Sequence, residues 1–161
     1  MNNPDPLVSV LMTSYNREKY IAEAIESVLD SHYRNIELII VDDVSKDSTV
    51  KIAMDYAAKD RRVKVFINKK NMGDYPNRNK AVSYAVGDYF IFVDSDDKLN
   101  ADTIGKILNT AKEDANFNFA MYWPHSDMTF SLKGDEALQM HFFEKQFLYM
   151  GPGGTFIRRD F

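Results

Sequence analysis

The chain has 161 residues, of which 45% are hydrophobic and 27% charged, as in an ordinary soluble globular domain. A formal net charge of −4 without a basic stripe argues against a nucleic-acid partner. The lack of cysteine excludes disulfides and thiolate metal sites, and no stretch of about 18 apolar residues predicts a transmembrane segment.

Apolar strands and amphipathic helices alternate through the first 60 residues. An apolar run at residues 7–12 predicts a strand, and apolar side chains at helical spacing over residues 17–31 predict the helix that follows. A second strand is expected at residues 36–41. The next helix is expected to begin at an N-cap, either Asp47 or Ser48.

The same alternation continues along the chain. A third strand is expected at residues 63–67, and Pro76 suits the first position of a helix that ends at Gly87. The unbroken apolar run 89–93 is typical of a central strand buried on both faces. Asn100 is the expected cap of a fourth helix. Further elements are expected as strands at residues 117–123, 128–132 and 155–158 and as a helix at 135–146.

This alternation predicts an α/β fold with a doubly wound, mostly parallel sheet. In such sheets, ligands bind outside the carboxyl ends of the strands. Three polar clusters come directly after expected strands: residues 13–16, 42–43 and 94–97. We therefore expect all three clusters on one edge of the sheet.

The acidic segment Asp94–Asp97 places three carboxylates at the end of an apolar strand. They remain ionised together at low cost only if a cation lies among them or if all face bulk water. A cation would be Mg²⁺ or Mn²⁺ shared with a ligand's phosphates, whereas the alternative is an acidic turn that caps the next helix. The second acidic pair, Asp42 and Asp43, favours the cation, and Arg78 and Lys80 are expected to add counter-charge.

Several nucleotide-binding families do not fit this chain. Neither a Gly-x-Gly-x-x-Gly motif nor a P-loop follows the first strand, which counts against dinucleotide oxidoreductases and P-loop NTPases. A sugar nucleotidyltransferase would require a Gly-rich triphosphate loop there. A receiver domain would carry its acidic pair at that position, which here holds residues 13–15.

Five segments, in order and with ordinary spacing, match a known family. They are Val8–Asn16, Glu37–Ser45, Asn71–Gly73, Arg78–Asn79 and Val93–Asp97. Together they resemble the family 2 glycosyltransferases, which have the Rossmann-like GT-A nucleotide-sugar-binding fold. The resemblance implies a single domain over 1–161, with a nucleotide-sugar-binding half at 7–105 and the start of an acceptor half at 106–161.

The resemblance also implies a role for each matching residue in binding the nucleotide. Thr13 and Tyr15 would flank the base, and Asp43 would accept a hydrogen bond from a ring N–H of uracil or a similar base. Arg78 would lie near the nucleotide. The expected donor is a nucleotide-diphosphate sugar, with a UDP-sugar first among the candidates.

The acidic segment would supply the sugar and metal contacts. Asp94 would lie near the ribose or the sugar, and Ser95 is assigned to the same nucleotide-sugar site. Asp96, with help from Asp97, would hold Mg²⁺ or Mn²⁺ on the diphosphate. The implied reaction is metal-assisted transfer of the sugar, with inversion, to the hydroxyl of a glycan, a lipid-linked acceptor or a protein.

The general base of this family follows a Gly-rich segment and a strand that residues 153–159 resemble. We therefore expect it beyond Phe161, so that the catalytic residue is unknown and this chain alone binds donor but transfers it poorly. Asp160 is available in principle but is better explained as a surface acid. The alternative is a non-catalytic nucleotide-sugar-binding module. The expected role is polysaccharide biosynthesis, in the cytoplasm or peripherally at the inner face of the membrane.

Overall fold

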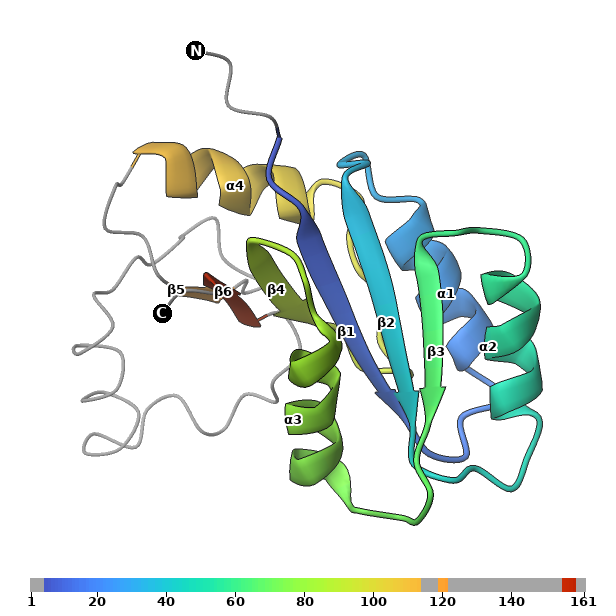
Figure 1. The fold of residues 1–161 in the computed structure, drawn as a ribbon. Helices are drawn as coiled ribbons and strands as arrows, with labels where there is room; N and C mark the ends of the chain where they lie inside the picture. Colours follow the sequence, from blue (N-terminus) through green and yellow to red (C-terminus); the bar gives the residue numbers. More distant parts are fainter. Residues whose placement is uncertain (1–4, 114–118, 122–154, 159–161) are drawn as a thin grey trace.

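The computed structural model describes residues 5–113, 119–121 and 155–158. Within them, a six-stranded sheet has the order β3-β2-β1-β4-β6-β5 (Figure 1). The strands are β1 (Val8–Ser14), β2 (Ile36–Asp42), β3 (Val63–Ile67), β4 (Tyr89–Phe92), β5 (Phe119–Met121) and β6 (Thr155–Arg158). The helices are α1 (Ile21–Leu29), α2 (Thr49–Ala57), α3 (Asp74–Tyr84) and α4 (Thr103–Glu113).

Helices cover both faces of the parallel part of the sheet. On one face, alternate strand side chains such as Val10 and Leu38 are fully buried with side chains of α1, α2 and α4. On the other face, Leu11 and Ile39 are buried with Ala81 of α3. Because successive side chains of these strands are buried on opposite faces, each strand appears in the sequence as a continuous apolar run.

The topology confirms the predicted α/β, doubly wound, mostly parallel sheet. β3, β2, β1 and β4 are parallel, and β6 is antiparallel to both β4 and β5. The chain moves outward from β1 to β3 and then returns to place β4 on the other side of β1. The order therefore switches between β1 and β4, where ligands bind in folds of this type.

Two helices begin at different residues from those expected. α1 begins at Ile21 rather than at residue 17, because residues 18–20 form a turn in which Arg17 O accepts from the N–H groups of Tyr20 and Ile21. α3 begins at Asp74, after Gly73 in the left-handed region at φ +82°. Pro76 is therefore its third residue, and a missing N–H costs nothing within the first turn.

The other boundaries lie close to the expected ones. Ser48 holds the N-cap position of α2, but it is the Asp47 carboxylate that accepts the Thr49 N–H, at 2.9 Å. Before α4, Asn100 Oδ1 accepts the Asp102 N–H. The strand expected at 117–123 is described only at 119–121, and the elements expected at 128–132 and 135–146 lie outside the described residues.

Candidate functional site

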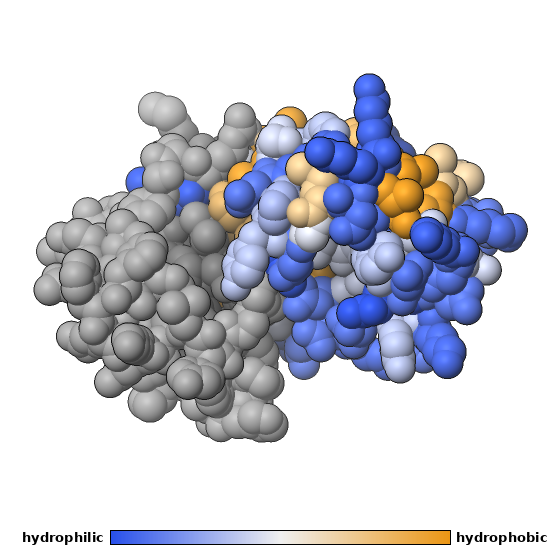
Figure 2. Space-filling view, turned by 90° about the horizontal axis from the view of Figure 1, so that it is seen from below, coloured by the Kyte–Doolittle hydropathy of each residue, from blue (hydrophilic) through white to orange (hydrophobic). Residues whose placement is uncertain are grey.

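A cavity of about 460 Å³ lies at the carboxyl ends of the parallel strands, the lower edge in Figure 1. Seen from that side, the described surface is mainly hydrophilic, with smaller hydrophobic areas (Figure 2). The cavity is lined by the carboxyl end of β1 and the turn after it, by the segments after β2 and β4, and by the start of α3 with the loop before it. The lining residues are Thr13, Ser14, Tyr15, Arg17, Asp43, Asn71, Gly73, Asp74, Asn77, Arg78, Asp94, Ser95 and Asp96.

The cavity brings together nearly all the site residues expected from the sequence. The proposed base contacts are Thr13, near the carboxyl end of β1, and Tyr15, directly after it, and the acidic segment lies after β4. Of the predicted residues, Asp97 is not part of the lining, and Asp160 lies outside the described residues. The three polar clusters therefore share one edge, as predicted, while the role of each residue stays a prediction.

The turn after β1 is fixed to the turn after β2 by hydrogen bonds. Asp43 N–H donates to Ser14 O at 2.8 Å, and Asn16 N–H donates to Ser45 Oγ at 2.8 Å. Arg17 N–H donates to Thr49 Oγ1 at 2.7 Å. These bonds hold the backbone on which the cavity side chains are mounted.

Two residues in these turns have positive φ: Asn16 at 54° and Val44 at 67°. Asn tolerates the left-handed region, but Val is β-branched and strained there. Asp42 stabilises the strained turn, because its carboxylate accepts from the N–H and the hydroxyl of Ser45 and from the hydroxyl of Ser14. Asp42 is 1% exposed, so it shapes the turn and does not face a ligand.

Asp43 fixes the loop before α3. Its Oδ1 accepts from Asn68 Nδ2 and Met72 N–H, both at 2.8 Å. Its Oδ2 accepts from Met72 N–H at 2.9 Å and from Gly73 N–H at 2.8 Å. The carboxylate is 3% exposed, so a base could use it only by replacing one of these protein donors.

Two arginines each form an ion pair with one carboxylate of the acidic segment. Arg78 Nη2 lies 2.7 Å from Asp94 Oδ1, and Arg17 Nε lies 3.2 Å from Asp96 Oδ2. Arg78 is also held by Asp74, at 2.9 Å from Nε, and its guanidinium lies over the ring of Phe92 at 5.6 Å. Arg78 is therefore fixed on several sides.

The Arg78–Asp94 pair leaves polar atoms unsatisfied. The 2.7 Å separation makes an ion pair, but its geometry is not that of a hydrogen bond. Arg78 Nη1 and Asp94 Oδ1 are both buried without a hydrogen-bond partner among the described residues. Such atoms carry a desolvation cost that a polar ligand in the cavity would relieve.

The charges in the cavity do not balance. Four lining carboxylates, those of Asp43, Asp74, Asp94 and Asp96, face two guanidinium groups, which leaves a formal net charge of −2. Burial raises the pKa of the neighbouring Asp97 carboxyl, and repulsion from Asp94 and then Asp96 raises it further. The acidic segment is thus crowded with negative charge, and a cation would relieve it.

Some contributors were not singled out from the sequence. Arg17 and Asn77 line the cavity, and nothing in the local sequence distinguishes them from other surface or helix residues, whereas Asn71 belongs to a matched segment but was given no role. Conversely, Lys80 was expected to face the carboxylates but does not line the cavity. Its ammonium donates to Asn68 Oδ1 at 2.8 Å, because its position on α3 directs it toward the end of β3.

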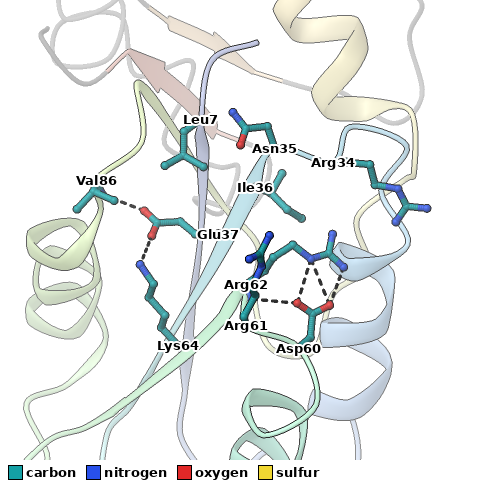
Figure 3. Close-up of a pocket in the computed structure, with 10 residues that line it drawn as sticks. All are labelled: Leu7, Arg34, Asn35, Ile36, Glu37, Asp60, Arg61, Arg62, Lys64 and Val86. Carbon is teal, nitrogen blue, oxygen red and sulfur yellow. Dashed lines mark hydrogen bonds and ion pairs between the residues drawn. The ribbon is translucent and has the colours of Figure 1, made fainter. Parts of the chain in front are cut away.

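A larger cavity, of about 610 Å³, lies at the opposite edge of the sheet near the start of β2 (Figure 3). Its charges are largely paired within the protein: Lys64 with Glu37 at 2.7 Å and Arg62 with Asp60 at 2.7 Å. Burial raises the pKa of Glu37, but hydrogen bonds from Lys64, Ser9 and the Val86 N–H together hold it below its usual value. Two further cations, Arg34 and Arg61, also line this cavity and leave it with a formal net charge of +2. It lies at the amino ends of the strands, away from the switch point between β1 and β4, and is therefore not the better candidate site.

The comparison with known proteins agrees with the geometry. Residues 9–160 match the family model described as Glycosyl transferase family 2. The putative teichuronic acid biosynthesis glycosyltransferase TuaG of Bacillus subtilis (strain 168) is 42% identical over 123 residues, which cover 76% of this chain and 49% of that protein. An uncharacterized glycosyltransferase of Haemophilus influenzae is 43% identical over 104 residues, covering 65% of this chain and 42% of that protein. The chain thus spans less than half the length of these relatives.

Solved structures show the same fold. S. aureus TarS 1-349 in complex with UDP-GlcNAc has a TM-score of 0.72 at 26% identity, over 94% of this chain and 45% of that one. The mannosyltransferase PcManGT from Pyrobaculum calidifontis, in complex with GDP-Man and Mn²⁺, has a TM-score of 0.65 at 21% identity, over 71% and 34%. Among the described residues, no helix has the length and apolar character that a membrane span requires.

Proposed function

The chain belongs to glycosyl transferase family 2 and has the GT-A fold, and from this we propose that it binds a nucleotide-sugar for transfer to an acceptor hydroxyl. The observation that carries the proposal is the cavity at the β1/β4 switch point, where carboxylates and arginines converge. TarS in complex with UDP-GlcNAc and PcManGT in complex with GDP-Man support a nucleoside diphosphate sugar as the donor.

The residues present suit a hard divalent ion. Among the described residues, no three acidic or histidine side chains form a ready metal site. Mg²⁺ does not need one, because it is commonly bound by one or two carboxylates together with substrate phosphates and water. Asp96, with Asp97 beside it, would hold Mg²⁺ or Mn²⁺ in this way. When bound, the ion would stabilise the negative charge that develops on the departing diphosphate.

The remaining cavity residues would bind and orient the donor. Thr13 and Tyr15 border the cavity, and Tyr15 is 44% exposed, so its ring is available to a base. The donor's polar groups would form hydrogen bonds with Arg78 Nη1 and Asp94 Oδ1, which are buried without one among the described residues, although Asp94 Oδ1 is ion-paired with Arg78 Nη2. Base reading by Asp43 stays a prediction, since a ring N–H must then replace a backbone donor.

We propose an inverting reaction, in which the acceptor hydroxyl attacks the anomeric carbon as the diphosphate leaves from the opposite side. A general base would remove the hydroxyl proton. Each carboxylate that lines the described cavity is already paired with a cation or with backbone donors. We therefore assign the base to none of them.

Calorimetric titration with UDP and with GDP tests the donor and metal assignments. We expect the nucleotides to bind in Mn²⁺ and their affinity to fall at least about tenfold in EDTA. We expect an equal loss of affinity in Asp96→Asn, because this variant loses a charged oxygen ligand. Asp55→Asn is the matched control, because Asp55 is an exposed carboxylate on α2. Equal affinity in Mn²⁺ and EDTA would refute the metal role. Absence of binding to either nucleotide would refute the donor site.

A further inference from the structure

Arg17 has a different environment from the other arginine of the cavity. Its side chain is 42% exposed, whereas the Arg78 side chain is 11% exposed and is held by two carboxylates and an aromatic ring. The Arg17 guanidinium touches Asp96 at 3.2 Å, and its other contacts are with backbone carbonyls of Tyr15 and Asn16 at 3.3 and 3.5 Å. Arg17 is therefore the less constrained of the two arginines that line the cavity.

The backbone of Arg17 is nevertheless fixed. Its N–H donates to Thr49 Oγ1 at 2.7 Å, and its carbonyl accepts from the N–H groups of Tyr20 and Ile21, both at 3.0 Å. A movement of Arg17 is thus confined to the side chain. The guanidinium reaches from the turn after β1 to the turn after β4, and both Arg17 and Asp96 line the same cavity.

Arg17 contacts the carboxylate to which the proposed function assigns a divalent ion. Two cations cannot share Asp96 Oδ2 at contact distance without repulsion. A nucleoside diphosphate, in contrast, brings negative oxygens into the cavity, and a planar guanidinium with its fork of N–H donors suits phosphate oxygens. The same side chain therefore opposes the metal alone and favours the diphosphate.

We propose that Arg17 exchanges partners on donor binding: it leaves Asp96 when a divalent ion binds there and takes the diphosphate of the nucleotide instead. Arg17 is then a donor-binding residue that also offsets part of the negative charge of the acidic segment until a divalent ion binds. This inference rests on the proposed function, because it requires that the cavity bind a nucleoside diphosphate with a divalent ion.

The test measures two affinities in Arg17→Gln. Mn²⁺ alone is titrated by electron paramagnetic resonance of the free ion, and UDP and GDP are titrated calorimetrically at saturating Mn²⁺. Loss of a half-exposed competitor should tighten Mn²⁺ binding about two- to fivefold. Loss of a charge-assisted contact should weaken nucleotide binding about tenfold or more. The effects have opposite signs, which a general loss of structure cannot produce.

Two further variants separate charge from geometry. Lys19→Gln removes an equal charge from an exposed position on the same turn and should shift both constants by less than about twofold. Arg17→Lys keeps the charge without the fork, so we expect Mn²⁺ affinity near wild type and nucleotide affinity between those of wild type and Arg17→Gln.

The outcomes distinguish this inference from the function on which it rests. If wild type binds neither nucleotide in Mn²⁺, the proposed function fails. If wild type binds nucleotide but Arg17→Gln changes neither constant, or moves both in the same direction, the partner exchange is wrong and the proposed function stands.

Discussion

Replacing Asp43 by Asn should destabilise the protein by about 3 to 5 kcal/mol, even without ligand. The Asp43 carboxylate accepts from Asn68 Nδ2, Met72 N–H and Gly73 N–H at 2.8 to 2.9 Å. An amide keeps one oxygen and turns an NH₂ group toward the other donors. At least one buried donor is then unpaired, at a cost of about 1 to 3 kcal/mol, and the remaining bonds lose their charge assistance, about 1 kcal/mol each.

Urea unfolding followed by circular dichroism measures this loss as a lower midpoint at unchanged slope. Hydrogen exchange read by mass spectrometry should show faster exchange in the peptide that contains residues 68–73, because the loop loses its anchor. Asp55→Asn again serves as the control: its exposed pair with Lys51 contributes about 0.5 kcal/mol or less. A stability within about 0.5 kcal/mol of wild type, with unchanged exchange in the loop, would show that Asp43 does not hold it.

Two further predictions concern the effect on stability of two residues that lie outside the lining of the candidate site, Val44 and Glu37. Val44→Asn should raise the free energy of unfolding by about 1 kcal/mol in urea titration, because Asn tolerates the φ of 67° better than a β-branched residue; an unchanged or lower stability would contradict strain at this turn. Glu37→Gln should make the free energy of unfolding less dependent on pH. The folded-state pKa of Glu37 lies below its unfolded value of 4.5, so the ionised carboxylate stabilises the fold above that pH. This contribution is lost as the pH falls through the folded pKa. Unfolding curves from pH 7 to pH 3 that fall in parallel for both proteins would contradict this.

The positions of the strands along the chain could be predicted because burial determines which side chains they carry. β1, β2 and β4 are buried between helices on two faces, so their apolar runs are visible in the sequence. Helix starts were predicted less well, since they depend on hydrogen bonds between distant turns. Before α1, for example, Arg17 O closes the turn that delays the helix, and the N–H groups of residues 16 and 17 are held by Ser45 and Thr49, far along the chain.

The location of the site followed from the sequence, but its internal pairing did not. Parallel strands must bring their carboxyl ends to one edge, so polar residues after β1, β2 and β4 had to meet there. Which arginine meets which carboxylate depends on side-chain reach between turns. Arg17 lies 79 positions from Asp96 along the chain, and no local pattern links the two residues.

The two acidic clusters turn out to serve different purposes, although the sequence suggested one shared need for counter-charge. Asp42 and Asp43 are 1% and 3% exposed, and N–H and O–H donors of the protein satisfy them. A carboxylate that accepts two or three such bonds stays ionised without a cation. Among the described residues, no backbone N–H or hydroxyl donates to the carboxylates of Asp94 and Asp96, which pair with arginines instead. The proposed divalent ion would therefore bind at that segment and not at the pair after β2, which would instead form the wall against which the donor rests.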